Sequence, residues 1–189
     1  NAFEYASYDD DVEIVFLDLS YLSISSVSAY EVGKSIQLLK KNGKKVIAYG
    51  DFLSQSQYLL ASYADEIILN PFGMVFLEGF KKYQIYLKDF LDNNNIVVNT
   101  FVAGDYKSAT EIFSESKMSE QDRQQSKIFL NDLWRNWLKE VSNNRSSLDV
   151  DINFFINNFN ELDSSLSAAE KAKKYGLVDK ILTRIELRK

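Results

Sequence analysis

Short, almost continuously apolar runs alternate along this chain with longer stretches whose apolar residues recur every three or four positions. The apolar runs predict buried β-strands at 12–19, 45–49, 66–70, 74–77 and 96–102. The periodic stretches predict helices at 27–42, 54–64, 79–93 and 119–141. The first run, VEIVFLDL, has no polar alternation, so its strand is expected to be buried on both faces. Because helices separate most of the strands, the pattern predicts a largely parallel sheet with right-handed crossovers.

Polar residues and helix breakers mark the ends of these elements. Ser119, Asp151 and Ser167 are each placed to cap the N-terminus of a helix. Pro71 and Gly73 are expected to stop the third strand. The chain therefore reads as one α/β domain over residues 12–189, with additional helices towards its C-terminal end.

The predicted helix 119–141 carries a stripe of large apolar residues. Leu130, Trp134, Trp137 and Val141 follow one another at 4-3-4 spacing, which places them on one helical face. Tryptophans in such a stripe favour a role as core or interface anchors over a role as a ligand platform.

Composition narrows the function classes. The chain has 189 residues, 22 basic and 27 acidic, and a net charge of −5, which argues against a nucleic-acid partner. No apolar run approaches the roughly 18 residues that a membrane-spanning helix needs. Residues 1–11 are polar and end in three aspartates, so a disordered or linker segment is expected there. With no initiating Met and no signal peptide, any anchor of the parent protein is expected upstream of Asn1.

Histidine and cysteine are both absent. A Ser-His-Asp triad, a thiolate nucleophile, a disulfide and a His- or Cys-ligated metal are therefore excluded for this chain. Asp149, Asp151 and Asn153 imitate the start of a calcium loop, but Phe154 and Asn160 replace the glycine and glutamate that its geometry requires. No metal or cofactor is predicted. Among covalent schemes, a serine or threonine nucleophile with a lysine base survives.

Lys107 is the candidate base. It follows the apolar run 96–102 and an Ala-Gly-Asp turn, in the sequence IVVNTFVAGDYKSATEIF. A lysine at the end of a buried strand can be partly desolvated, and desolvation favours the neutral amine that a base requires. The alternative is an ordinary solvated lysine in a turn. Ser108 could orient the lysine amine or simply serve the turn.

Four segments together resemble one family. They are KKVIAYGDFLSQSQYLLASYADEIILNPFG (44–73), the GDYKSA turn (104–109), LWRNWL (133–138) and AKKYGLVDKI (172–181). In this order and spacing they are similar to the amino-terminal half of the long form of signal peptide peptidase A, also called protease IV. The resemblance covers about residues 12–185.

The resemblance implies a crotonase-like fold, shared with the Clp protease subunit, and a second similar domain outside this chain. It implies a bacterial, membrane-associated serine peptidase that degrades released signal peptides on the periplasmic face of the inner membrane. Its partners would be its own carboxy-terminal domain, further copies of the protein and hydrophobic signal peptides, with a membrane anchor outside this chain. Catalysis would use a Ser-Lys dyad, with Lys107 as the base and the serine on the carboxy-terminal domain. This chain alone would be soluble and inactive.

In the same resemblance, the position of the family's nucleophilic serine falls on Gln55, a residue that cannot attack a carbonyl. Ser54 and Ser56 flank it, but neighbours on a helix point about 100° away, so a capping or surface role is expected for both. Two other readings stay open. One is a non-catalytic assembly or substrate-docking domain, and the other is a crotonase-like enzyme that acts on acyl-thioesters.

Overall fold

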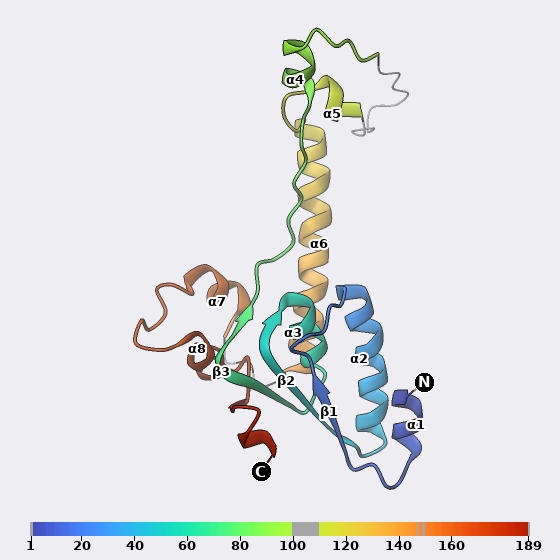
Figure 1. Ribbon diagram of the computed structural model, residues 1–189, viewed down its shortest axis with the longest axis vertical. Helices are drawn as coiled ribbons and strands as arrows, with labels where there is room; N and C mark the ends of the chain where they lie inside the picture. Colours follow the sequence, from blue (N-terminus) through green and yellow to red (C-terminus); the bar gives the residue numbers. More distant parts are fainter. Residues whose placement is uncertain (1, 100–109, 147, 149, 189) are drawn as a thin grey trace. The chain divides into compact units, whose positions relative to one another are not determined.

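Four parallel strands form one sheet in the order β1-β2-β3-β4. We analysed a computed structural model, which describes residues 2–99, 110–146, 148 and 150–188. The strands are β1 (Ile14–Asp18), β2 (Lys45–Ser54), β3 (Glu66–Phe76) and β4 (Lys180–Ile181). Figure 1 shows β1, β2 and β3 side by side. The predicted α/β class with a parallel sheet is confirmed.

The helices follow the predicted order with some differences in extent. They are α1 (Ala2–Tyr8), α2 (Ser26–Lys41), α3 (Gln55–Ala61), α4 (Lys88–Asn93), α5 (Glu111–Ser114), α6 (Glu120–Asn144), α7 (Ile152–Asn158), α8 (Ala168–Lys174) and the short 3-10 helix Glu186–Arg188. The predicted caps are confirmed, because the side chains of Ser119, Asp151 and Ser167 accept backbone N–H bonds from the first turns of α6, α7 and α8.

The core lies where α2 and α3 contact the sheet. Val46 and Ala48 of β2 and Ile67 of β3 are completely buried. Ile36 and Leu39 of α2, which share one helical stripe, are buried as well. Trp137 and Val141 of α6 belong to this core, so the prediction of a packing role for the tryptophan stripe holds for them.

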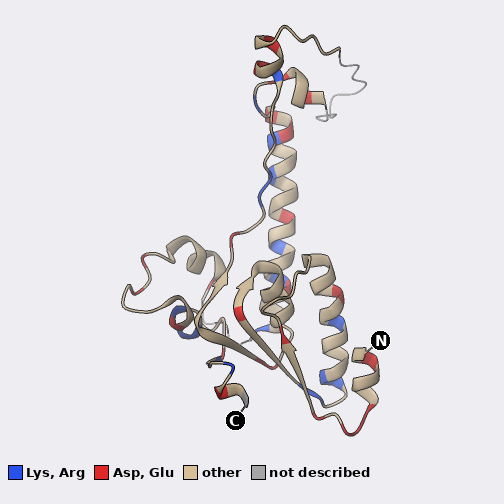
Figure 2. Ribbon diagram, viewed as in Figure 1, with Lys and Arg blue, Asp and Glu red and all other residues tan. Residues whose placement is uncertain are grey.

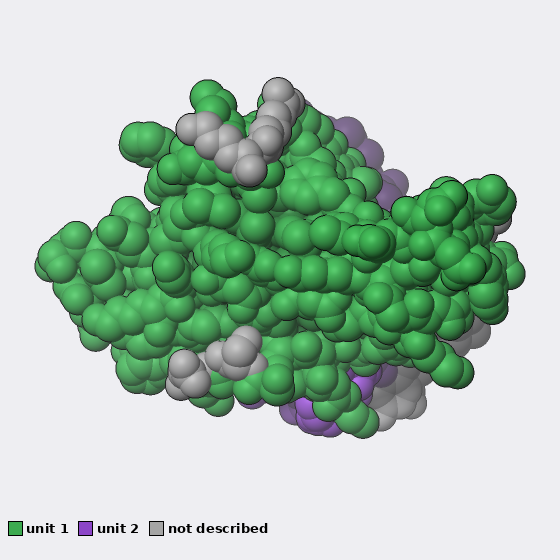
Figure 3. Space-filling view, turned by 90° about the horizontal axis from the view of Figure 1, so that it is seen from below, with its two compact units in different colours: residues 1–78, 137–189 green, residues 79–136 purple. Residues whose placement is uncertain are grey.

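The chain divides into two units, coloured separately in Figure 3. Unit 1 comprises residues 1–78 and 137–189 and contains the sheet. Unit 2 comprises residues 79–136. In unit 2 the Lys82 ammonium lies 2.9 Å from the buried Asp122 carboxylate of α6, and the Phe80 and Trp134 rings pack edge to face. The predicted anchoring role of Trp134 is thus a contact inside unit 2.

β3 is one strand, and the prediction that Pro71 and Gly73 stop it is wrong. Its pairing with β2 runs from Glu66 to Leu69, shifts register, and resumes from Met74 to Phe76. A β-bulge of this kind accommodates a proline without loss of a ladder bond. Gly73 is required there, since a Cβ would lie 2.3 Å from the Asp51 carbonyl oxygen.

Two predicted elements of unit 2 differ in the described residues, one being shorter than predicted and the other not formed. Only 88–93 of the predicted helix 79–93 is helical, and residues 96–99 of the predicted strand 96–102 form no strand. Tyr83 and Val97 are 87% and 84% exposed. A periodic or β-branched sequence forms a helix or a strand only where its side chains can pack against a neighbouring surface. The described part of unit 2 offers no such surface to Tyr83 or Val97.

β1 and the N-terminal segment also differ from prediction. β1 is an edge strand, and Ile14 and Phe16 on one face are about half exposed, so it is not buried on both faces. Ala2–Tyr8, expected to be a disordered or linker segment, form α1, which contacts α2. The acidic residues that follow α1 lie in the connection to β1 (Figure 2).

Candidate active site

The candidate site is built on the connection from β2 to α3. Ser54 is the last residue of β2 and the N-cap of α3, and its hydroxyl and backbone N–H form a reciprocal capping box with Gln57. The Gln57 side-chain amide donates to the carbonyls of Leu19 and Leu22, at 2.7 and 2.8 Å. The first turn of α3 is therefore fixed to the carboxyl end of β1.

Gln55, which the sequence resemblance predicts to occupy the position of the family's serine, is the first residue of α3 and is half-buried. Its side-chain oxygen Oε1 accepts a hydrogen bond from the backbone N–H of Glu78, at 3.3 Å. Its carbonyl oxygen accepts a hydrogen bond from the indole Nε1 of Trp137, also at 3.3 Å. Gln55 thus connects α3 to the end of β3 and to α6.

The two flanking serines have structural contacts. Ser54 caps α3, and the Ser56 hydroxyl shares a hydrogen bond of 3.0 Å with the Ser26 hydroxyl at the start of α2. The capping role expected for Ser54 is confirmed, and Ser56 joins two helix N-termini.

A model of peptidase family S49 matches residues 38–189, from α2 through the described C-terminal end. The chain belongs to peptidase family S49. The parallel α/β sheet agrees with the Clp-protease-like fold expected for this family. The prediction of the family from its four sequence segments is confirmed.

Relatives within the S49 family include Protease 4 of Haemophilus influenzae, which is 34% identical over all of this chain and 31% of its own length. Protease 4 of Salmonella typhi is 37% identical over 77% of this chain and 24% of its own length. The chloroplastic serine protease SPPA of Arabidopsis thaliana is 26% identical over 98% of this chain and 28% of its own length. The chain spans less than a third of each of these relatives.

Lys107 and Ser108 lie outside the described residues. Glu111, whose charge would oppose a neutral lysine nearby, is described in unit 2. The Ser119 hydroxyl donates to Glu111 Oε1 at 2.7 Å, and the Ser119 backbone N–H donates to Oε2 at 3.3 Å. Both oxygens of the Glu111 carboxylate are therefore hydrogen-bonded to Ser119, the residue that caps α6.

An ion pair that the sequence alone did not reveal involves the segment AKKYGLVDKI (172–181), one of the four segments that resemble the family. Both terminal nitrogens of Arg145 donate to the Asp179 carboxylate at 2.9 Å, and Nη2 also donates to the Gly176 carbonyl at 3.0 Å. Asp179 also accepts the Ile67 N–H at 2.7 Å. Asp179 thus holds the end of α6 and the C-terminal segment to β3. The bidentate pair spans 34 positions, so no local signal could reveal it.

A second polar cluster lies at the carboxyl ends of β1 and β2. Arg184 binds Asp18 in a bidentate pair at 2.7 and 3.1 Å and reaches Asp51 at 3.3 Å. Burial opposes ionisation of Asp18, but hydrogen bonds from Ser20 and Arg184 outweigh it and lower the Asp18 pKa. Burial likewise opposes ionisation of Asp51, and hydrogen bonds from Tyr49 and other neighbours lower its pKa. In this cluster the Arg184 guanidinium is thus paired with the carboxylates of both Asp18 and Asp51.

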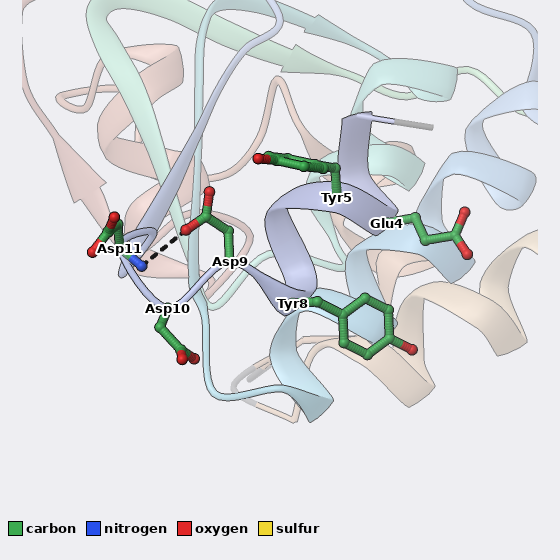
Figure 4. A pocket seen from close by; sticks show the side chains of 6 residues that line it. All are labelled: Glu4, Tyr5, Tyr8, Asp9, Asp10 and Asp11. Atoms are coloured by element: carbon green, nitrogen blue, oxygen red, sulfur yellow. Dashed lines mark hydrogen bonds between the residues drawn. The ribbon is translucent and has the colours of Figure 1, made fainter.

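Acidic and aromatic side chains gather around a pocket at the N-terminal segment (Figure 4), which is lined by Glu4, Tyr5, Tyr8, Asp9, Asp10 and Asp11. The Asp11 N–H donates to Asp9 Oδ1 at 3.0 Å, and the Lys44 ammonium donates to the Asp9 carbonyl at 2.6 Å. Within the described ranges, no three His, Cys, Asp or Glu side chains are grouped to hold a metal ion. Nor does any helix in the described part of the chain combine the length and apolarity needed to cross a membrane.

Proposed function

We propose that this chain is the base-donating part of a membrane-associated serine endopeptidase that degrades released signal peptides with a Ser-Lys dyad. Lys107 is the base, and the nucleophilic serine belongs to a further domain of the full-length protein. The observation that carries the proposal is S49 membership of a chain that lacks histidine. The sequence resemblance adds that Gln55 falls on the position of the family's serine.

The proposed reaction moves one proton twice. Neutral Lys107 accepts the proton of the serine hydroxyl while the serine oxygen attacks a peptide carbonyl. Lys107 then returns that proton to the leaving amine, which leaves an acyl-enzyme. Water hydrolyses the acyl-enzyme in the same manner, with Lys107 as the base. The scheme requires burial of Lys107 in the assembled protein, because a solvated lysine with a pKa near ~10.4 stays protonated at neutral pH.

Two features of the described residues support this assignment. The Glu111 carboxylate is bound by Ser119, which offsets part of its negative charge within unit 2. The Ser54 and Ser56 hydroxyls already have structural partners, so neither is a substitute for the missing nucleophile. Ser108 is proposed as a residue that orients the lysine amine.

The first experiment compares the 189-residue chain with the full-length protein on a hydrophobic, signal-like peptide. We expect hydrolysis by the full-length protein and none by the chain alone, because the chain lacks the nucleophile. Hydrolysis by the chain that Lys107→Ala abolishes would contradict the proposal, since it would place a complete active site within these residues.

A non-catalytic assembly or docking domain is the second candidate, and exposed aromatic residues favour it. Phe52 and Phe76 lie on neighbouring strands with ring centroids 5.9 Å apart, and each is 42% exposed. Exposed aromatics on a sheet are typical interface anchors. Sedimentation of the full-length protein with Phe76→Glu, against Tyr5→Glu on α1 as a control, tests this reading. A domain that serves only assembly would lose its oligomer in the first variant and tolerate Lys107→Ala without loss of hydrolysis.

The acyl-thioester reading rests on the crotonase-like fold alone. Coenzyme A is therefore expected to leave the melting temperature of the chain unchanged, and a dose-dependent rise would revive that reading.

A further inference from the structure

The N-terminus of α6 is capped by residues from outside the helix. The Ser119 hydroxyl accepts the Asp122 N–H at 3.1 Å, as an N-cap serine does. Ser119 also donates two hydrogen bonds to the Glu111 carboxylate, from its hydroxyl to Oε1 at 2.7 Å and from its backbone N–H to Oε2 at 3.3 Å. Both residues are half-buried and belong to unit 2, and Glu111 is the first residue of α5. A side chain of α5 therefore satisfies a backbone donor at the start of α6 (Figure 1).

The helices α3 and α8 show the usual form of this cap. In each of them the N-cap backbone N–H donates to the side chain three residues further on, which is Gln57 in α3 and Glu170 in α8. This reciprocal arrangement is a capping box, and it uses a glutamine or a glutamate at that third position. In α6 the third position is Asp122, whose side chain is one methylene shorter than that of glutamate. Glu111 supplies the acceptor that Asp122 does not.

The Asp122 carboxylate is paired with a different group. The Lys82 ammonium donates to both of its oxygens, at 2.9 and 3.0 Å, and also to the Ser126 hydroxyl at 2.8 Å. The Asp122 side chain is 4% exposed, so its charge depends on this partner. The start of α6 thus has two carboxylates, Asp122 bound to Lys82 and Glu111 bound to Ser119. The positive end of the helix dipole favours both of them.

The bond of Glu111 also fixes a segment of the chain. The second residue of α5, Ile112, accepts the Leu87 N–H at 2.7 Å. Glu111 adds to this contact a bond to Ser119, eight positions further along the chain. Lys107 precedes Glu111 by four positions in the sequence. The chain that follows Lys107 in the sequence is thus attached at Glu111 to the start of a 25-residue helix.

We propose that Glu111 is a positioning residue, which completes the N-terminal cap of α6 in place of Asp122 and thereby holds the chain segment that follows Lys107. The catalytic consequence rests on the proposed function, in which Lys107 is the base. Glutamate suits this role because an ionised carboxylate accepts both Ser119 hydrogen bonds and is stabilised at a helix N-terminus.

Amide hydrogen exchange of the 189-residue chain tests the cap without any activity. Glu111→Ala removes both acceptors of Ser119, so exchange of the Ser119 amide is expected to rise by about tenfold or more. Glu111→Gln retains an acceptor oxygen, and it should keep most of the protection. Glu115→Ala is the matched control, because Glu115 is an exposed glutamate at the other end of α5, and it should leave the Ser119 rate unchanged.

An unchanged Ser119 exchange rate in Glu111→Ala would overturn the proposal, since the amide would then depend on another acceptor. If Glu111→Ala does not fold, Glu111→Asp decides, because its carboxylate is one methylene shorter and no longer reaches both Ser119 donors. Faster exchange of the Ser119 amide in Glu111→Asp would support the proposal, and an unchanged rate would count against it.

Kinetics of the full-length protein test the catalytic consequence. A misplaced base slows the chemical step, so Glu111→Ala is expected to lower kcat by about 10- to 100-fold with little change in KM. Glu111→Gln should restore most of this loss, and Glu115→Ala should keep the kcat of the parent. A normal kcat in Glu111→Ala would overturn the positioning role. Full activity of Lys107→Ala would overturn the proposed function instead, and exchange of the Ser119 amide would still rise in Glu111→Ala.

Discussion

Replacement of Arg145 tests whether its ion pair holds the C-terminal segment to the sheet. Arg145 follows α6 directly, and its side chain is 4% exposed. Arg145→Met keeps an unbranched apolar stem and removes the guanidinium. The variant leaves the Asp179 carboxylate with the Ile67 N–H as a remaining donor and leaves the Gly176 carbonyl without its Arg145 donor.

The expected loss of stability follows from burial. Removal of one partner of a fully buried ion pair costs about 3–5 kcal/mol, because the other charge stays buried and uncompensated. The Asp179 side chain is 30% exposed, so water offsets part of this cost. We therefore expect Arg145→Met to lower the free energy of unfolding by about 2–3 kcal/mol. For a chain of this size the melting temperature should fall by about 5–10 °C.

Urea denaturation of the 189-residue chain measures this loss, and Arg135→Met is the matched control on α6. Arg135 is 75% exposed and pairs with Asp132 at 3.1 Å, so its loss should cost below about 0.5 kcal/mol. Addition of Asp179→Asn to Arg145→Met should recover part of the stability, because it removes the uncompensated charge. Equal costs for Arg145→Met and Arg135→Met, or further loss in the double variant, would refute this reasoning.

Two further predictions concern the packing and the polar cluster of unit 1. Gly33→Ala should lower the melting temperature, because the added Cβ would lie 2.2 Å from the Tyr63 ring. This clash is expected to outweigh the helix propensity of alanine, which exceeds that of glycine by about 1 kcal/mol. A raised melting temperature would contradict the packing of Gly33 against Tyr63. Arg184→Met should destabilise the chain at pH 7, and the difference from the parent chain should shrink in acid. The folded chain holds the pKa values of Asp18 and Asp51 below their ordinary value of 3.8. Both ionised carboxylates therefore stabilise the folded chain at any pH above 3.8, and this contribution is lost as the pH falls through the lowered pKa values. Thermal melts at pH 7 and pH 3 measure this, and an equal difference at both pH values would count against it.

Local signals in the sequence predicted much of the fold. The caps at Ser119, Asp151 and Ser167 depend on contacts two or three residues away, and the stripe through Trp137 depends on one helical face. Such contacts are visible in a linear pattern, so these predictions were confirmed. The family could be predicted for the same reason, because its segments keep their order and spacing.

The failures come from partners that a linear pattern does not show. Pro71 interrupts a strand by local rules, but the register shift between β2 and β3 accommodates it. Ile96, Val97 and Val98 are β-branched, yet no described strand pairs with them. The bonds of Gln55 to Glu78 and Trp137 join positions 23 and 82 apart, so they appear only in the folded chain.

The base role of Lys107 is the central claim, and one comparison in the full-length protein tests it most directly. The variants Lys107→Ala and Lys117→Ala are assayed at saturating concentrations of a hydrophobic peptide. Lys117 serves as the control because it is an exposed lysine ten positions further along the chain. A general base contributes about 10²- to 10⁴-fold, so kcat of Lys107→Ala should fall by at least about 100-fold while Lys117→Ala keeps its activity. A kcat of Lys107→Ala within about twofold of the Lys117→Ala value would contradict the account.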